Sequence, residues 1–264
     1  MKKIWITICL LSLLGCLAAG SYIAYYRTNE KKGKTAYEEI KDRAKQERPK
    51  KVSPLPEKTV TPTVFPTPTE VPVEIPVDFK KLQKQNSDIY AWISVKGTNV
   101  DYPVLQSSED DSLYIDHGID KEPLFAGAIY SERKNNKNFT DFNTILYGHN
   151  MKDGSMFASL HNFRDEEFFQ KNREILIYTS EHIFHYEIFA AYTFDNRHIL
   201  NTFDFSTEMG RSAYLDEVYQ VRSMDAHFLE QPKVTEKDKI ITLSTCIGRD
   251  DARYLVQGVL TEME

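Results

Sequence analysis

The 264-residue sequence predicts a mainly β domain with helical insertions, placed behind an N-terminal membrane helix and a proline-rich stalk. Three observations predict this organisation. Residues 4–26 carry no charged side chain, residues 49–77 hold 8 of the 11 prolines, and the remainder alternates short strand-like runs with a few helical stretches. Many short strands with few helices favour a closed or sandwich-like β structure.

The uncharged run over residues 4–26 is long enough to cross a bilayer. As a helix it spans roughly 34 Å, against about 30 Å for the hydrocarbon core. Its length favours an uncleaved anchor over a cleaved signal peptide, whose apolar part has about 7–15 residues. A lipoprotein signal ending at Cys16 is a third interpretation, but the run stays apolar beyond that cysteine.

The lysines and arginines around this run give its orientation a first test. Lys2 and Lys3 precede it, and four basic residues follow it closely, at positions 27, 31, 32 and 34. Counted alone, they place the body of the protein inside the cell. Large domains can cross the membrane regardless of charge, so the count does not decide the orientation.

Residues 27–77 read as a basic juxtamembrane segment followed by a Pro/Thr-rich stalk. Residues 27–58 carry a net charge of +5, and "KTAYEEIKDRAKQE" predicts a solvated helix rather than one lying on anionic lipid. Residues 62–76 favour polyproline II, because proline removes backbone donors and fixes φ. Such a stalk would hold a domain roughly 80 Å or less from the membrane. A disordered linker without a length requirement is the alternative.

Residues 78–264 are long enough for one domain with a sizeable core. It is predicted to open with a helix over 78–93, capped by Asp78, with Phe79, Leu82 and Ile89 on its apolar side. Two further helices are predicted over 156–172 and 206–221. Runs rich in Val, Ile, Tyr, Phe and Thr predict strands over 99–106, 126–131, 143–150, 174–180, 185–194, 239–246 and 253–260.

Charge and histidine placement exclude several classes of partner. The chain has a net charge of −6, and residues 59–264 alone carry −13, which argues against a nucleic-acid partner. His182 and His185 would point to opposite faces of a strand, which argues against a shared metal. No metal and no cofactor are therefore predicted. Four other histidines are expected to be surface or packing residues: His117, His161, His198 and His227.

Cys246 is the one cysteine outside the apolar run, so it has no partner for a disulfide in the domain. It ends the strand-like run "KIITLSTC", where a loop begins and a ligand can reach it. A lone cysteine with histidines elsewhere in the sequence is a candidate nucleophile. A buried structural thiol is the alternative.

A thiol with its usual pKa of about 8.5 needs a base or a cation to become a nucleophile. His149 is the best candidate base, because it also lies at the end of an apolar run, in "NTILYGHNMKDGSMF". Arg253 begins the next strand and would return beside Cys246 across a hairpin, where it could stabilise an oxyanion. Arg249 is its rival, and either arginine could instead pair with Asp250 or Asp251.

These motifs together resemble the sortases, and specifically their class B branch. "TLSTC" followed by an arginine that heads a strand, with "NTILYGHNMKDGSMF" upstream, carries the resemblance. "WISVKGTNVDYPVLQ" and "FHYEIFAAYTF" also fit that branch. The resemblance covers residues 78–264 but not the stalk. The spacing from Cys246 to Arg253 varies within the family, so the arginine is the least fixed of the three assignments.

The resemblance implies an eight-stranded sortase β-barrel and a membrane-anchored cysteine transpeptidase on the outside of a Gram-positive bacterium. It also implies added N-terminal helices and a long helix before the cysteine strand, matching residues 206–221. It places the N-terminus inside and the domain outside, against the lysine count. Cys246 would be the nucleophile, His149 the acid and base, and Arg253 the oxyanion donor. Tyr147 and Ser244 would line the substrate pocket.

The implied substrates are secreted proteins with a C-terminal sorting signal, cleaved after a threonine, and a peptidoglycan amine that accepts the acyl group. Three alternatives stay open. The acceptor could be a lysine of another protein subunit, as in pilin-joining sortases. Water could accept the acyl group, which would make the protein a cysteine hydrolase. The domain could also be a non-catalytic wall-binding module.

Overall fold

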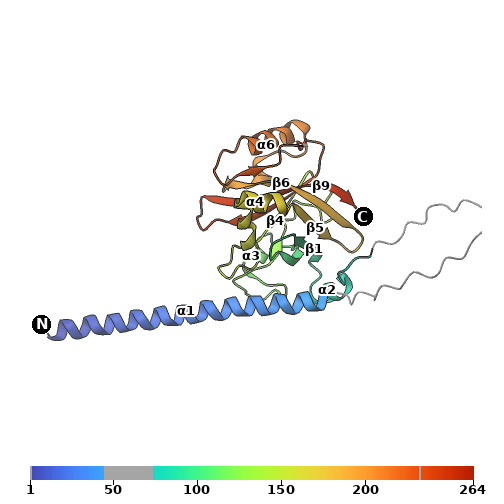
Figure 1. Cartoon of the computed structure of the whole chain (residues 1–264). Helices are drawn as coiled ribbons and strands as arrows, with labels where there is room; N and C mark the ends of the chain where they lie inside the picture. Colours follow the sequence, from blue (N-terminus) through green and yellow to red (C-terminus); the bar gives the residue numbers. More distant parts are fainter. Residues whose placement is uncertain (1, 45–73, 232) are drawn as a thin grey trace, which may run out of the picture.

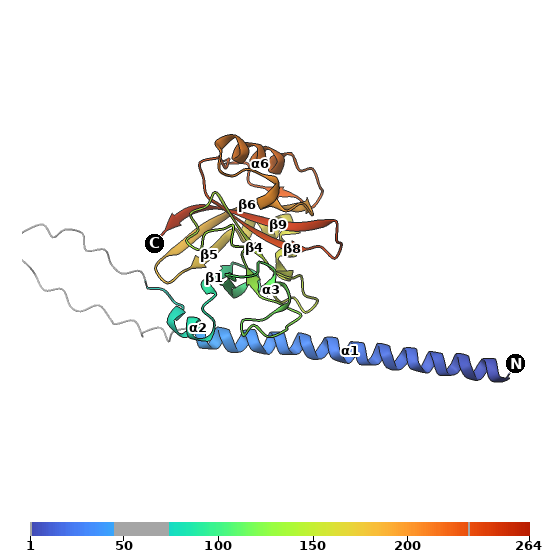
Figure 2. The same cartoon turned by 180° about the vertical axis from the view of Figure 1, so that it is seen from behind.

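The computed structural model describes residues 2–44, 74–231 and 233–264. Eight strands form a closed barrel, with one long helix along one side and a second helix on the opposite side (Figures 1 and 2). The strands are β1 (Ile89–Val95), β2 (Asp101–Leu105), β3 (Ile129–Tyr130), β4 (Asn143–Tyr147), β5 (Glu174–Tyr178), β6 (Ile183–Asp195), β7 (His227–Phe228), β8 (Ile240–Cys246) and β9 (Ala252–Met263). The helices are α1 (Lys2–Ala44), α2 (Phe79–Gln85), α3 (Leu113–Asp116), η1 (Ala158–Arg164, a 3-10 helix), α4 (Glu166–Lys171), α5 (Ile199–Thr202) and α6 (Glu208–Gln220).

The barrel closes through β5, which pairs with both β1 and β6. The order around the ring is β5-β1-β2-β3-β4-β8-β9-β6, and β7 is added to β6 outside it. The predicted eight-stranded barrel is therefore confirmed. Register shifts in β6 opposite β9 let this long pair bend around the barrel. At the centre of the sheet, β8 lies parallel to β4 and antiparallel to β9.

Two hydrophobic cores hold the strands in place. The first fills the barrel and includes Ile93, Val104 and Leu243, all fully buried. The second lies between the sheet and α6, where Tyr214 and Val218 pack against residues of β6 and β9. The helix predicted over 206–221 is thus present as α6, and Thr207 caps it by accepting from the Gly210 amide.

Two predicted helices are shorter than expected. Asp78 caps α2 as predicted, with Phe79 and Leu82 buried, but the helix ends at Gln85. Ile89 belongs to β1 and not to the helix, because "IYAWISV" is a short apolar run that is buried on both faces. The helix predicted over 156–172 is divided at Asp165, whose side chain accepts from the Phe168 amide and begins α4.

The juxtamembrane segment is not solvated as predicted. It continues α1 to Ala44, and Tyr37, Ile40 and Ala44 are buried against the domain. The Tyr37 hydroxyl donates to the Gly127 carbonyl, and its ring meets the Tyr102 ring edge-on at 5.4 Å. The missed signal was a one-sided apolar stripe at i, i+3 and i+7.

The stalk prediction falls mostly on residues 45–73, which lie outside the described residues. Their flanking residues lie next to each other, because the Asp78 amide donates to the Ala44 carbonyl at 3.1 Å. The end of α1 and the start of the domain are therefore in contact. The stalk over residues 45–73 stays a prediction.

Candidate active site

Parallel pairing of β4 with β8 sets the position of the two candidate catalytic side chains. Tyr147 and Ser244 are register partners, and the Gly148 amide donates to the Ser244 carbonyl at 3.2 Å. His149 and Cys246 each lie two residues further along. Because parallel strands run in the same direction, both side chains reach the same edge of the barrel. Cys246 is a free, half-buried thiol.

Two contacts fix the His149 imidazole. Its Nε2 donates to the Ile115 carbonyl at 2.6 Å, so Nδ1 is the nitrogen that can accept or release a proton. Its ring is stacked on Phe125, with centroids 6.3 Å apart and planes 8° from parallel. Ile115 belongs to α3, and Phe125 belongs to the loop between α3 and β3. That loop carries no sequence signal of this role, and neither residue was predicted.

Arg253 lies where the hairpin argument placed it. It is the register partner of Cys246 across β8 and β9, and side chains of directly opposed residues share a face. Its guanidinium donates to the Ala252 carbonyl at 3.0 Å. The rival Arg249 is exposed in the β8–β9 loop and pairs with Asp251 at 3.1 Å. The register therefore favours Arg253.

The five predicted site residues line one cleft of about 290 Å³ at this edge of the barrel. Its walls include Tyr147 and Ser244 as predicted, and Tyr130, which was not predicted. Tyr130 and Tyr147 are stacked with ring centroids 5.4 Å apart. Burial and then the Glu132 carboxylate raise the pKa of both phenols, so both remain neutral hydrogen-bonding groups.

The backbone carbonyl of Cys246 receives two side-chain hydrogen bonds. Asn150 Nδ2 and His161 Nε2 each donate to it at 3.0 Å. Burial lowers the pKa of His161, and the Arg164 guanidinium lowers it further, against the hydrogen bond to Cys246. The expectation that His161 has only a surface or packing role is therefore incomplete. Its position in η1 gave no sequence signal, whereas Asn150 directly follows His149.

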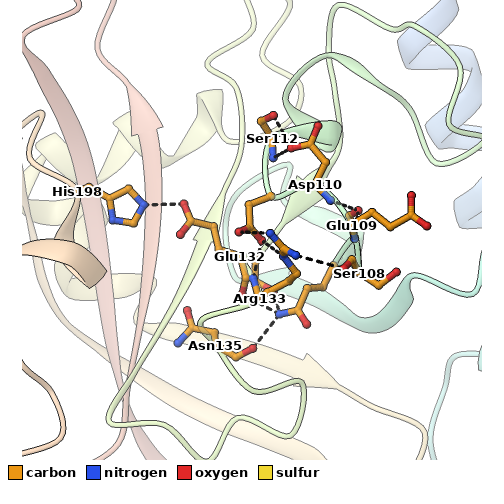
Figure 3. Close-up of polar contacts among 12 residues, drawn as sticks. Ser108, Glu109, Asp110, Ser112, Glu132, Arg133, Asn135 and His198 are labelled. Atoms are coloured by element: carbon orange, nitrogen blue, oxygen red, sulfur yellow. Dashed lines mark hydrogen bonds and ion pairs between the residues drawn. The ribbon is translucent and has the colours of Figure 1, made fainter.

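His198 also lies at the site, on the cleft wall beyond β6. Its Nε2 pairs with the Glu132 carboxylate at 2.8 Å (Figure 3). The segment that follows Tyr130 is held by further bonds, because Gln106 donates to the carbonyls of Glu132 and Asn135. Arg133 pairs with Asp111 on the neighbouring turn at 3.1 Å. This network fixes the wall that carries Tyr130.

The remaining histidines lie away from the cleft. His117 pairs with Asp116, and His227 donates to the Arg164 carbonyl. His185 pairs with Glu264 at the C-terminus. Across the residues that the structure describes, no three His, Cys, Asp or Glu side chains are grouped to hold a metal ion. The predicted independence from a metal or cofactor stays a prediction.

The geometry agrees with the comparisons to known proteins. A family model described as the sortase domain matches residues 93–261. Sortase B of Listeria monocytogenes is 38% identical over 188 residues, covering 69% of this chain and 74% of that protein. Sortase B of Staphylococcus aureus is 31% identical over 168 residues, covering 64% of this chain and 67% of that protein.

Solved structures agree with the fold. The crystal structure of Clostridium perfringens sortase B superimposes with a TM-score of 0.63 at 31% identity, covering 70% of this chain and all of that one. A substrate complex of Staphylococcus aureus sortase B gives a TM-score of 0.62 at 30% identity, covering 70% and 84%. The chain therefore belongs to the sortase family of cysteine transpeptidases, and within it to the class B branch.

Proposed function

We propose that Cys246, His149 and Arg253 carry out the transpeptidation on a C-terminal sorting signal. The register carries the proposal: His149 and Cys246 end adjacent parallel strands, and Arg253 is directly opposite Cys246. A nucleophile, a proton carrier and a charged donor thus meet in one cleft. That is the set of groups that acyl transfer through a thioester requires.

In the first step, the Cys246 thiolate attacks the carbonyl carbon of a threonine in the sorting signal. The carbonyl oxygen gains negative charge, and the Arg253 guanidinium donates to it. As the tetrahedral intermediate collapses, the amide C–N bond breaks and a thioester remains on Cys246. His149 Nδ1 gives its proton to the departing amine, because Nε2 is bonded to Ile115.

In the second step, the amine of a peptidoglycan precursor or cross-bridge attacks the thioester carbon. His149 Nδ1, now neutral, takes a proton from this amine. The C–S bond breaks, the new amide leaves, and the thiolate and imidazolium are restored. Tyr147 and Ser244 bind the signal peptide along the cleft wall, and Tyr130 extends that wall. Their neutral hydroxyls suit an uncharged peptide backbone.

Localisation follows from this chemistry. Among the described residues, α1 is the one helix that is long and apolar enough to cross a membrane. We infer that its N-terminus lies inside and the catalytic domain outside, where secreted proteins and cell wall are found. The net positive charge of residues 27–58 favours the opposite orientation, with the domain inside the cell, but large domains can cross the membrane regardless of charge.

The experiment uses the full chain in detergent micelles, mixed with a small library of sorting-signal peptides and followed by intact-mass spectrometry. The arms contain diaminopimelate, oligoglycine, a lysine-bearing protein or no amine, and each is repeated with Cys246→Ala. A thioester adduct on the unsubstituted chain that one peptidoglycan amine resolves supports the proposal. Resolution only by the protein lysine identifies a pilin-joining enzyme, and resolution by water alone identifies a hydrolase. An unreactive, buried thiol would contradict the assignment of Cys246.

A further inference from the structure

The anchor helix α1 and the active-site cleft are closely linked. Tyr26, the last residue of the uncharged run, contacts Phe125 edge-on with ring centroids 5.3 Å apart. The Phe125 ring is in turn stacked on His149. Three aromatic rings thus connect the end of the predicted span to the candidate acid and base. Gly33 continues the contact, since a Cβ there would lie 3.2 Å from the Ala126 side chain.

The helix is fixed against the domain and is not a free tether. Burial of Tyr37, Ile40 and Ala44 orders α1 up to the start of the domain. The domain begins at the level where the uncharged run ends. Lys152 lies over the Tyr26 ring at 5.5 Å, and the loop around it forms a groove with residues as far back as Tyr22. If residues 4–26 span the bilayer, this edge of the domain lies at the bilayer surface.

This edge carries an exposed apolar pair. Phe125 is 53% exposed and Ile115 is 43% exposed. Beyond α1, they are the only exposed large hydrophobic residues other than methionines among the residues that the structure describes. Both contact His149, Phe125 through its ring and Ile115 through its carbonyl, and Ile115 also lines the cleft. The β8–β9 loop, which follows Cys246, lies at the end of the domain that faces the N-terminal half of α1 in both views (Figures 1 and 2).

We propose that Ile115 and Phe125 rest in the interfacial layer of the bilayer, so that the cleft opens at the membrane surface. The partner is the lipid bilayer itself. Apolar side chains next to a span insert at the level of headgroups and upper acyl chains, where tyrosines such as Tyr22 and Tyr26 are also favoured. The charges that line this groove balance, with Arg27 and Lys152 beside Glu30 and Asp153. The apolar pair itself carries no charge, so its contact should depend little on the fraction of anionic lipid.

This inference rests on the proposed membrane anchoring of α1 but not on the proposed reaction. It gives the docked helix a role that a flexible stalk could not have. A substrate that is itself held in the membrane by a hydrophobic segment would meet the cleft without leaving the surface. The local concentration of two membrane-held reactants would rise accordingly.

The test is site-directed spin labelling of the full chain in phosphatidylcholine nanodiscs and in phosphatidylglycerol nanodiscs. The background is Cys9→Ser, Cys16→Ser and Cys246→Ala, with one cysteine added at a time. Leu14→Cys reports the span, Ile115→Cys and Phe125→Cys report the rim, and Met209→Cys and Met224→Cys are matched exposed controls away from α1. Power saturation compares collisions with oxygen, which partitions into lipid, and with a water-soluble nickel chelate.

We expect labels at 14, 115 and 125 to collide more with oxygen than with nickel, and labels at 209 and 224 to show the reverse. Tyr37→Ala removes a buried side chain that holds α1 against the domain. In this variant the label at 125 should become accessible to the nickel chelate, while the label at 14 stays in lipid. The inference is overturned if the labels at 125 and 224 are equally accessible to the nickel chelate while the label at 14 stays in lipid. That outcome leaves the membrane anchoring of α1 intact. A nickel-accessible label at 14 contradicts the anchoring itself.

A second measurement avoids labelling and keeps Cys246. Phe125→Trp in a Trp5→Phe background is read by fluorescence quenching with brominated lipids. The remaining native tryptophan, Trp92, is buried in β1, so the background alone measures its contribution. Quenching above that background supports the contact. Quenching equal to it, in a chain whose circular dichroism spectrum and melting temperature match those of the background, contradicts the contact in a folded protein.

Discussion

Cys246 and Arg253 lie directly opposite each other, one as the last residue of β8 and the other as the second residue of β9. The pairing is made by backbone hydrogen bonds, so the distance between the two side-chain origins does not depend on the loop between them. Arg249, although nearer in sequence, lies in that loop and pairs with Asp251. The loop can therefore vary in length while the guanidinium stays beside the thiol.

Arg253→Gln should lower kcat/KM by about 10²–10³, the loss typical of removing one oxyanion donor. The matched control is Arg249→Gln, which should stay within about twofold, because its exposed ion pair contributes little. Steady-state transfer of a sorting-signal peptide to an amine gives both numbers. Equal losses in the two variants would contradict the role given to Arg253.

His161 should make folding stability depend on pH. Its imidazole pKa is lowered in the folded state by burial and by Arg164, whereas the unfolded value is about 6.5. The unfolded chain then binds a proton more readily than the folded chain. The contribution is fully present above pH 6.5 and is lost as pH falls through that value toward the folded pKa.

Urea unfolding at several pH values between 5 and 8 tests this prediction. His161→Gln keeps a donor to the Cys246 carbonyl and removes the titration, so its unfolding free energy should fall less on acidification. His117→Gln is the control, since His117 lies away from the cleft and pairs with Asp116. An unchanged acid slope in His161→Gln would contradict the prediction.

Seven of the eight barrel strands, all but β1, could be predicted from sequence because their apolar runs are bounded by Gly, Asn and Asp. The hairpin argument that placed Arg253 beside Cys246 agrees with the observed register of β8 and β9. What failed has a physical cause. Ile89 was assigned to a helix because short apolar runs do not distinguish a strand from a buried helix. The docking of α1 depends on a surface that only the folded domain presents.

The residues around Cys246 also divide into those that the sequence predicted and those that it did not. Residues on β4 and β8 were found, whereas Phe125, Ile115 and His161 were not. The latter come from α3, from the loop that follows it and from the 3-10 helix η1, whose positions are set by tertiary contacts. His198 was expected to be a surface or packing residue, and its partner Glu132 comes from a distant segment, which spacing in the sequence cannot reveal.

Gln257 is the centre of a buried polar network beneath α6. It is fully buried, and its amide donates to the hydroxyls of Tyr214 and Thr242 while it accepts from Tyr192. Gln257→Leu leaves buried hydroxyls without partners, and we expect it to lower the free energy of unfolding by about 3 kcal/mol. Gln170→Leu, on the exposed side of α4, should change it by less than about 0.5 kcal/mol. Urea unfolding of the two variants compares them, and equal values would show that the network contributes nothing.

Gly127 controls the carbonyl that orients His149. Its φ is +56°, and a Cβ there would lie 2.4 Å from the Ile115 carbonyl oxygen, the acceptor of His149 Nε2. Gly127→Ala should displace that oxygen and lower kcat by about 10²-fold, because small misplacements of a catalytic group are costly. Gly154→Ala is the matched control, since it has φ +80° but its nearest neighbour atom would lie 3.7 Å away, leaving only backbone strain of about 1 kcal/mol. Transfer assays and melting temperatures of both variants separate the loss of activity from the loss of stability. If the two variants have similar melting temperatures, Gly127→Ala should have lost activity and Gly154→Ala should have kept it. Equal activities would mean that the hydrogen bond to Ile115 does not orient the imidazole.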